Sequence, residues 1–286
     1  IHILKNIMII DTHTHIFPKE FSEERKQYIA LDSTFAEMYT NPKAKIANSI
    51  DLIENMNKTE INKSIALGIG WNNISLAIKS NNYLLKTQSD YPNRILAFCS
   101  INPNWKENAL KEIERCAVNG AVGIGELHPD SQQFSLSNLE LLSPIMNLAK
   151  ELNLIILIHS SEPVGHQYAG KGKTTPDKLM TLIENFPDNQ IICAHWGGGL
   201  PFYGLMPEIN ASLKNVYFDS AASPFLYETN IFDLIPECIN PENILFGSDF
   251  PLIKPDRYIK IINNSNLKKN IIKNILGNNA NKLFSR

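Results

Sequence analysis

Residues 10–15 read I-D-T-H-T-H and end a short apolar stretch near the start of the chain. Because side chains alternate faces along an extended strand, we expect Asp11, His13 and His15 to point the same way. Two imidazoles placed this way can bind one metal ion. An isolated H-x-H pair is weak evidence, however, because a histidine at a strand end is more often a hydrogen-bonded core residue.

The same kind of residue ends three further apolar runs. His159 ends L-I-I-L-I-H, His195 ends I-I-C-A-H, and Asp249 ends I-L-F-G-S-D. A buried strand carries an imidazole or a carboxylate only at a cost in free energy, unless a partner compensates it. The recurrence on four separate strands therefore predicts one shared polar site.

Short apolar and β-branched runs predict eight strands, with helix-like segments between most of them. The predicted strands lie near residues 7–12, 63–69, 94–101, 121–126, 154–159, 190–195, 214–219 and 243–248. Helical spacing predicts one helix over 105–119, with Ala109, Leu110, Ile113, Ala117 and Val118 facing inward and Gly120 ending it. A second helix is expected to begin with Ser143 as its N-cap and Pro144 as its first residue, and to bury Ile145, Leu148 and Leu152. A third is expected over 175–186, capped by Thr175, with Leu179, Leu182 and Ile183 inward.

This alternation predicts an α/β chain folded as a parallel eight-stranded (β/α)8 TIM barrel. An open doubly wound sheet is the alternative, but it needs a glycine-rich turn after the first strand, where this chain has D-T-H-T-H. The long polar segment 16–45 is expected to form a lid or insertion after strand one. No linker or repeat divides the chain, so residues 1–286 are expected to form a single domain.

Composition narrows the classes of partner. With 286 residues and a formal net charge of -2, the chain has no excess of positive charge for nucleic acid or a membrane surface. No apolar run approaches the roughly 20 residues of a membrane span. Four cysteines without a C-x-x-C pair are typical of a reduced, cytoplasmic protein. A small molecule is the expected substrate.

In a barrel, the strand-end residues would converge on the carboxyl-terminal mouth, where catalysis is normally sited. Neutral imidazoles and carboxylates suit Zn²⁺, which lowers the pKa of a bound water toward about 7. Glu126, in A-V-G-I-G-E-L-H, is expected to end strand four at the same mouth. The polar loop 160–173 should overhang it, and His166 is its best candidate for contacting substrate.

Four motifs in order, D-T-H-T-H, I-H-S-S-E-P, A-H-W-G-G-G and F-G-S-D-F-P, resemble those of the amidohydrolase superfamily. The resemblance is closest to the branch that includes aminocarboxymuconate-semialdehyde decarboxylase and several lactone hydrolases. It implies that His13, His15, His159 and Asp249 surround a principal metal ion. It also implies that His195 is either a second-metal ligand or a general acid/base, and that the protein can be a homo-oligomer.

Strand four departs from the two-metal relatives that carry a carboxylated lysine, because A-V-G-I-G-E-L-H has no lysine. Glu126 stands near that place, as in relatives where a glutamate bridges two metals. One ion is therefore expected, and two if Glu126 bridges them. His128 is expected to be a loop residue rather than a ligand.

The leading functional hypothesis is a metal-dependent hydrolase of a small amide or lactone that uses a metal-activated water. Asp249 would act as general base and His195 would polarise the carbonyl. The alternative is a non-oxidative decarboxylase of a small carboxylic acid, ranked second because arginine is scarce near the expected mouth. A third hypothesis, a non-catalytic binding barrel, is disfavoured because no core ligand position is lost.

Overall fold

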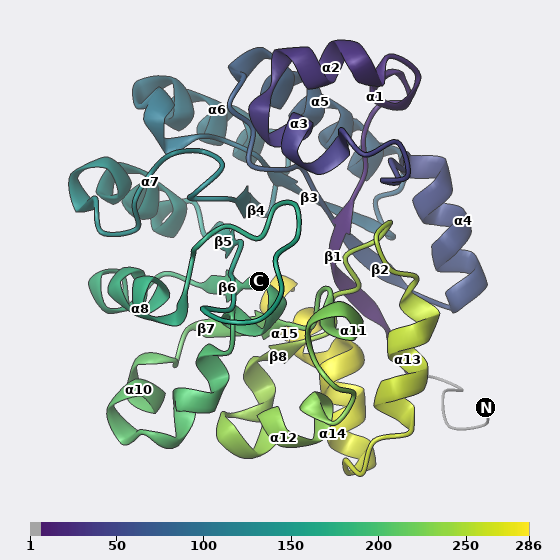
Figure 1. Cartoon of the computed structure of the whole chain (residues 1–286), viewed down its shortest axis with the longest axis vertical. Helices are drawn as coiled ribbons and strands as arrows, with labels where there is room; N and C mark the ends of the chain where they lie inside the picture. The colour runs from purple at the N-terminus through teal and green to yellow at the C-terminus, as the bar shows by residue number, and fades with distance from the viewer. Residues whose placement is uncertain (1–6, 286) are drawn as a thin grey trace.

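The computed structural model describes residues 7–285, so the two ends of the expected domain, residues 1–6 and 286, lie outside the described residues. Eight parallel strands lie side by side in the order β1 to β8 (Figure 1). Backbone contacts between β1 and the segment after β8 bring the ends of the sheet together, with Thr12 N donating to Phe246 O over 2.8 Å and Thr14 bridging Phe250. The predicted (β/α)8 barrel is confirmed. The strands are β1 (Ile10–His15), β2 (Lys63–Leu67), β3 (Ile95–Cys99), β4 (Gly123–Leu127), β5 (Ile155–Ile158), β6 (Ile191–Cys193), β7 (Val216–Asp219) and β8 (Ile244–Leu245).

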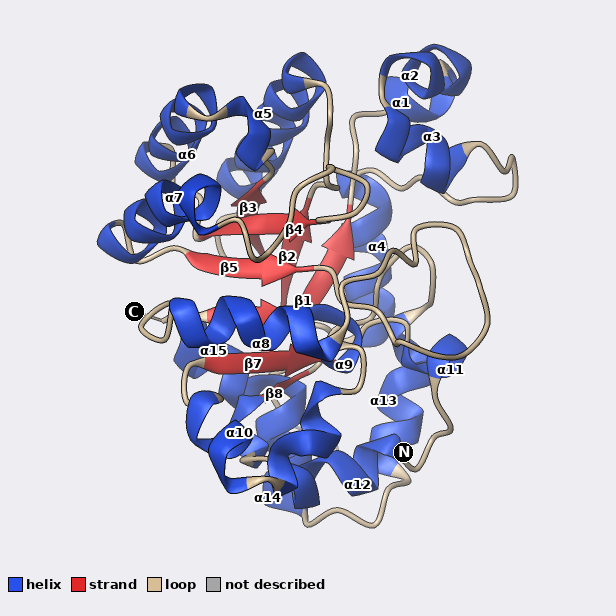
Figure 2. Cartoon of the chain, turned by 60° about the vertical axis from the view of Figure 1, so that its left-hand side comes forward, coloured by secondary structure: helices blue, strands red, loops and turns tan. Residues whose placement is uncertain are grey.

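Helices surround the sheet and cover its outer face (Figure 2). They are α1 (Glu20–Glu23), α2 (Arg25–Leu31), α3 (Ser33–Tyr39), α4 (Ser49–Thr59), α5 (Ile74–Asp90), α6 (Glu107–Val118), α7 (Leu139–Glu151), α8 (Pro176–Asn185), α9 (Ala194–Gly197), α10 (Pro207–Ser212), α11 (Ser223–Leu226), α12 (Ile231–Cys238), α13 (Pro255–Asn263), α14 (Lys269–Lys273) and α15 (Asn279–Phe284). No helix of the described part of the chain is both long and apolar enough to cross a membrane.

Strand side chains are divided between two apolar clusters. On β5, Leu157 belongs to an inner cluster with residues of the other strands, while Ile156 and Ile158 pack in the larger cluster that includes the helices. Ala280 and Leu283 of α15 join the inner cluster. The barrel interior is thus filled by apolar side chains and by α15. The polar strand-end residues lie at the carboxyl-terminal end of the strands.

The segment after β1 forms an insertion of its own, as expected for 16–45. Helices α1 to α3 pack around an aromatic cluster that includes Phe17, Phe21 and Phe35, all fully buried. Asp32 fastens this insertion to the barrel, since its carboxylate accepts from the backbone N–H of Phe35 as an N-cap and from Asn72 and Asn73 over 2.8 Å each. We call α1–α3 and the following residues to 46 the lid.

The second predicted helix begins earlier than expected. Helix α7 starts at Leu139 with Asn138 as its N-cap, and Pro144 lies inside it. Ser143 bonds back to the Leu139 carbonyl instead of capping. Pro144 is exposed, so the carbonyl that it leaves without an N–H partner can face solvent.

Two smaller expectations about helix faces and one about a helix cap were wrong. Val118 and Leu152 lie at helix ends that turn toward solvent, with exposed fractions of 87% and 36%. Thr175 does stand at the N-cap of α8, but its hydroxyl bonds to the Asp177 carboxylate and makes no cap. The predicted inward residues Leu179, Leu182 and Ile183 are all buried.

Candidate metal centre and pocket

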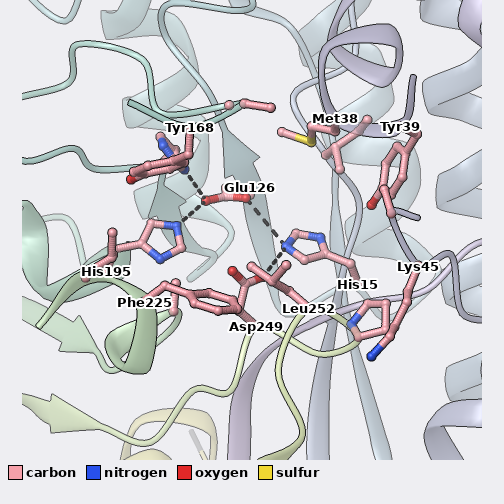
Figure 3. A pocket seen from close by; sticks show the side chains of 18 of the residues that line it. His15, Met38, Tyr39, Lys45, Glu126, Tyr168, His195, Phe225, Asp249 and Leu252 are labelled. Carbon is pink, nitrogen blue, oxygen red and sulfur yellow. Dashed lines mark hydrogen bonds and ion pairs between the residues drawn. The ribbon is translucent and has the colours of Figure 1, made fainter. Parts of the chain in front are cut away.

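The predicted site residues converge at the carboxyl-terminal mouth of the barrel. His13 and His15 lie on β1 and Glu126 on β4. His159 directly follows β5, His195 lies two residues after β6, and Asp249 lies four residues after β8. A cavity of about 520 Å³ opens over them (Figure 3). Its lining includes His15, Glu126, His159, His195 and Asp249 at the floor, and Met38, Tyr39, Lys43, Lys45, His166, Tyr168, Phe225 and Leu252 around it.

The first cluster that could hold a metal ion consists of His13, His15 and Asp249. The two Nε2 atoms face each other at 3.1 Å, and Asp249 Oδ1 lies 3.9 Å from His13 Nε2 and 3.6 Å from His15 Nε2. Ligand atoms that each lie about 2.0–2.2 Å from one ion are separated by roughly 3 to 4 Å. The donor atoms therefore fit a divalent ion in both chemistry and spacing.

Asp11 does not join this cluster, although alternation predicts that it points the same way as His13 and His15. Its carboxylate accepts from the Ser248 backbone and hydroxyl over 2.9 and 2.6 Å. The pairing of β1 with β2 shifts register between Asp11 and Thr14, so the strict alternation does not continue through this part of β1. Asp11 instead joins β1 to the segment after β8.

Glu126 lies between four imidazoles. Its Oε1 is 3.0 Å from His159 Nδ1 and 3.6 Å from His195 Nε2, and its Oε2 is 3.6 Å from His15 Nε2 and 3.8 Å from His13 Nε2. With His13 and His195 it forms a second cluster of metal-ligand type. Both clusters share His13, and its Nε2 can ligate one ion at a time, so a second ion would rely on Glu126 and His195 alone.

His159 is at the mouth but belongs to neither cluster. Its Nδ1 contacts Glu126, and its Nε2 lies 3.0 Å from the Lys171 carbonyl oxygen. His128 stacks on it with ring centroids 4.1 Å apart, and His128 is itself held by Gly170 O at 2.8 Å. The role of His159 as a metal ligand, implied by the family resemblance, stays a prediction.

His166 lies in the loop that overhangs the mouth, as expected. It lines the cavity, its side chain is exposed, and its ring lies 5.5 Å from that of Tyr168. Lys171 holds this loop closed on itself, since its ammonium donates to the carbonyls of Val164 and His166.

The charges at the mouth shift the pKa values of the histidines apart. Burial lowers the pKa of His13, but the charge and hydrogen bond of Asp219, together with the charges of Glu126 and Asp249, outweigh it and raise the pKa to about 10. Burial likewise lowers that of His195, while Glu126 and Asp249 raise it to about 9. For His15, burial and the neighbouring His13 lower the pKa. Neighbouring imidazoles whose pKa values are shifted in opposite directions are typical of a functional site.

The backbone is unusual at two of these residues. His195 has φ 55°, followed by four more residues of positive φ through Gly199, and Asp249 has φ 63°. Left-handed backbone is unfavourable for most residues other than glycine and is concentrated at functional sites. The turn is what aims His195 into the mouth directly after β6.

Several residues around the site were not identified from the sequence. Asp219 could have been, because it ends the apolar run V-Y-F-D of β7 in the same manner as the other strand-end residues. Lys43 and Lys45 carry no such signal, since they lie in the polar lid segment and reach the cavity only through the tertiary fold.

Together, the barrel and the histidine–carboxylate mouth define a (β/α)8 protein with a candidate metal centre. Residues 10–286 match the model of the family described as amidohydrolase. The chain therefore belongs to the amidohydrolase family, which confirms the resemblance seen in its motifs.

Solved structures with the same fold are distant in sequence. The 5-carboxyvanillate decarboxylase from Novosphingobium aromaticivorans, complexed with manganese and 4-hydroxy-3-methoxy-5-nitrobenzoic acid, is 18% identical, with a TM-score of 0.81, covering 98% of this chain and 97% of that one. The 2,6-dihydroxybenzoate decarboxylase from Rhizobium is 17% identical, with a TM-score of 0.73 and coverage of 98% and 99%. A crystal structure described as a putative amidohydrolase from Staphylococcus aureus is 20% identical, with a TM-score of 0.74 and coverage of 98% and 100%.

Proposed function

We propose that the chain, acting as one domain, is a metal-dependent non-oxidative decarboxylase of a small aromatic or similarly unsaturated carboxylic acid. The observation that carries the proposal is the pocket, in which a histidine–carboxylate floor lies beneath apolar side chains and two rim lysines, Lys43 and Lys45. These lysines supply the cations whose scarcity in the sequence had favoured hydrolysis. The decarboxylases among the similar structures also support decarboxylation over hydrolysis.

His13, His15 and Asp249 would hold the principal ion. Glu126 and His195 would hold a second ion if two bind, and His195 Nε2 would donate a proton only in the one-ion form. A divalent ion there would supply positive charge that binds and orients an anionic group of the substrate. Ligand type favours Zn²⁺, and Mn²⁺ is named for two of the similar decarboxylases. Elemental analysis of the purified protein distinguishes the two ions.

The chain's own residues would act on the bound acid in three ways. Phe225 and Leu252 would pack against its apolar body and exclude water, and Lys45 would attract an anionic group at the rim. His195 lies with Nδ1 3.2 Å from the Ala221 carbonyl, so its Nε2 faces the mouth. As the carbon–carboxylate bond breaks and CO₂ leaves, the electron pair left on carbon would take a proton from His195 Nε2.

Hydrolysis of a small amide or lactone is the second candidate. It is supported by Asp249, whose side chain is 14% exposed toward the cavity and could accept a proton from an attacking water. His195 would then polarise the carbonyl. The intact ligand clusters disfavour the third hypothesis, a barrel that binds without catalysis.

Two further points belong to the proposal. The cysteines are free, and three of them are buried, which supports a cytoplasmic site of action. The resemblance to the decarboxylase branch supports homo-oligomerisation, which sedimentation of the purified protein would test.

The discriminating experiment supplies the metal-loaded protein with a panel of hydroxybenzoates and carboxyvanillate-like acids, and in parallel with lactones and small amides. We expect CO₂ release from at least one acid and no hydrolysis. Hydrolysis of a lactone or amide without CO₂ release from any acid would reverse the order of the two candidates. Turnover by the His195→Asn variant at the wild-type rate would refute the role of His195.

A further inference from the structure

Asp219 is a fully buried carboxylate at the end of β7 to which neither the motifs nor the proposed function assign a role. Its two oxygens face different parts of the mouth. Oδ2 lies 2.8 Å from His13 Nδ1. Oδ1 accepts from the backbone N–H of His195 and of Ala221, each over 3.0 Å.

The contact with His13 sets which ring nitrogen faces the metal position. An ionised carboxylate is an acceptor only, so His13 Nδ1 must carry a proton and donate it to Asp219. The lone pair available for a metal is then on Nε2, the atom that faces His15, Glu126 and Asp249. A carboxylate behind a ligating histidine also fixes the orientation of the ring and raises its basicity.

The contact with His195 fixes the second part of the site. The left-handed turn that begins at His195 directs its backbone N–H toward β7, where Asp219 Oδ1 accepts it. The Ala221 carbonyl contacts the same histidine through ring Nδ1, and Ala221 N–H bonds to Asp219 as well. One side chain thus connects the His13 ring with the backbone that carries His195.

We propose that Asp219 is a positioning residue that presents His13 Nε2 to the metal and holds His195 at a set distance from it. The inference rests on the proposed metal-dependent function. It deepens that function by naming the residue that joins the ligand cluster to the proton donor.

Asp219→Asn tests the proposal because it preserves one contact and reverses the other. The amide oxygen can still accept from the N–H groups of His195 and Ala221, whereas the amide NH₂ would face His13 Nδ1. That nitrogen would then have to accept, which places the proton on Nε2 and blocks ligation. We expect the affinity for Zn²⁺ or Mn²⁺, measured by calorimetric titration, to fall about 10- to 100-fold.

Asp11→Asn is the matched control. Asp11 is equally buried, and its Oδ1 accepts from the backbone N–H groups of His13 and Ser248, but its Oδ2 contacts the Ser248 hydroxyl, which can rotate to donate or accept. We expect its metal affinity to stay within about threefold of wild type. A merely structural role for Asp219 would leave the proton on His13 Nδ1. NMR should detect this Nδ1–H proton in the zinc-loaded wild type and not in Asp219→Asn, where Nδ1 accepts a hydrogen bond.

Gly247→Ala provides a second test if Asp219→Asn does not fold. A methyl group at this position would lie 2.9 Å from His13 Cβ and 3.2 Å from Asp219 Cβ, so it would push the pair apart without changing its chemistry. We expect a loss of metal affinity here too. Wild-type affinity in Asp219→Asn, or in Gly247→Ala if the former does not fold, would overturn the inference, whereas failure of the wild-type protein itself to bind a divalent ion would overturn the proposed function.

Discussion

Replacement of Glu126 by glutamine should weaken the metal centre while leaving the barrel folded. Glutamine has nearly the same shape as glutamate, but it removes the negative charge that lies within 4 Å of four imidazoles. Glu126 is only 3% exposed, so solvent would compensate little of that change. The variant therefore isolates the effect of charge.

The magnitude follows from the contacts. At an effective dielectric constant of about 20, two unit charges 4 Å apart interact by about 4 kcal/mol, and desolvation offsets much of this. A hydrogen bond to a charged group, such as the one between His159 Nδ1 and Glu126 at 3.0 Å, contributes about 1.5–3 kcal/mol net. We therefore expect the Kd for the ion to rise about 10- to 100-fold, since 1.4 kcal/mol corresponds to tenfold.

The assay is calorimetric titration of Zn²⁺ or Mn²⁺ into metal-free protein, with circular dichroism to verify folding. If the wild-type protein binds two ions, the variant should bind one, because the cluster of His13, Glu126 and His195 loses its carboxylate. Glu37→Gln is the control. This lid carboxylate is exposed and bonds to Gly170 N and the Ser131 hydroxyl, away from the four imidazoles.

Equal stoichiometry and equal affinity in Glu126→Gln and wild type would refute the reasoning. That result would mean that Glu126 contributes nothing to the ion's field, and that the imidazoles around it are arranged by other contacts. A loss of affinity in Glu37→Gln of the same size would also contradict it, because the effect would then be unspecific.

Three further changes test the lid and the barrel wall. Lys45→Ala should raise the KM for an acid with a second anionic group about two- to fivefold, with little change in kcat or metal affinity, because an exposed ion pair contributes at most about 1 kcal/mol. Steady-state kinetics measures this change, and an unchanged KM would contradict the role of Lys45. Phe35→Ala removes a fully buried ring from the lid and should lower the free energy of unfolding by about 3–5 kcal/mol. Backbone hydrogen exchange across residues 17–46 should then be faster than in the wild type. Equal protection in variant and wild type would contradict the packing argument. Glu112→Gln should cost about 1–2 kcal/mol at pH 7 in denaturant unfolding, because burial alone would raise the pKa of this carboxyl but the Arg115 and other hydrogen bonds hold it below its ordinary value. Since that stabilisation is present above the unfolded pKa of about 4.3 and is lost as the pH falls through the lowered folded pKa, the difference between variant and wild type should shrink below about pH 4.

The sequence was sufficient for the barrel and for most of the mouth, because both depend on local patterns. Runs such as I-I-L-I followed by His159 identify a buried strand and the residue at its end without reference to any other part of the chain. The order of such runs then places every strand end at one mouth. His13, His15, Glu126, His195 and Asp249 meet there for this reason.

The sequence-based predictions were wrong where a residue's conformation depends on a contact with a distant segment of the chain. Alternation predicts that Asp11 shares a face with His13 and His15, yet the register of β1 shifts after Asp11, and Ser248 of the segment after β8 donates to both of its oxygens. Pro144 reads as a helix start, yet the helix begins five residues earlier, at Leu139, with Asn138 as its N-cap, and the exposed face tolerates the proline.

The tertiary structure alone decided which atoms of the mouth face one another. The pairing of His13 with Asp219 joins residues 206 positions apart, and it determines the ring nitrogen that is free for a metal. The lid brings Lys43 and Lys45 to the cavity, which reverses the order of the two enzymatic hypotheses. The strand pattern of the opening I-D-T-H-T-H predicts that two imidazoles share a face. The protonation and orientation of these imidazoles depend on carboxylates and carbonyls of other strands and loops. Contacts of that kind cannot be predicted from the spacing of residues within one segment.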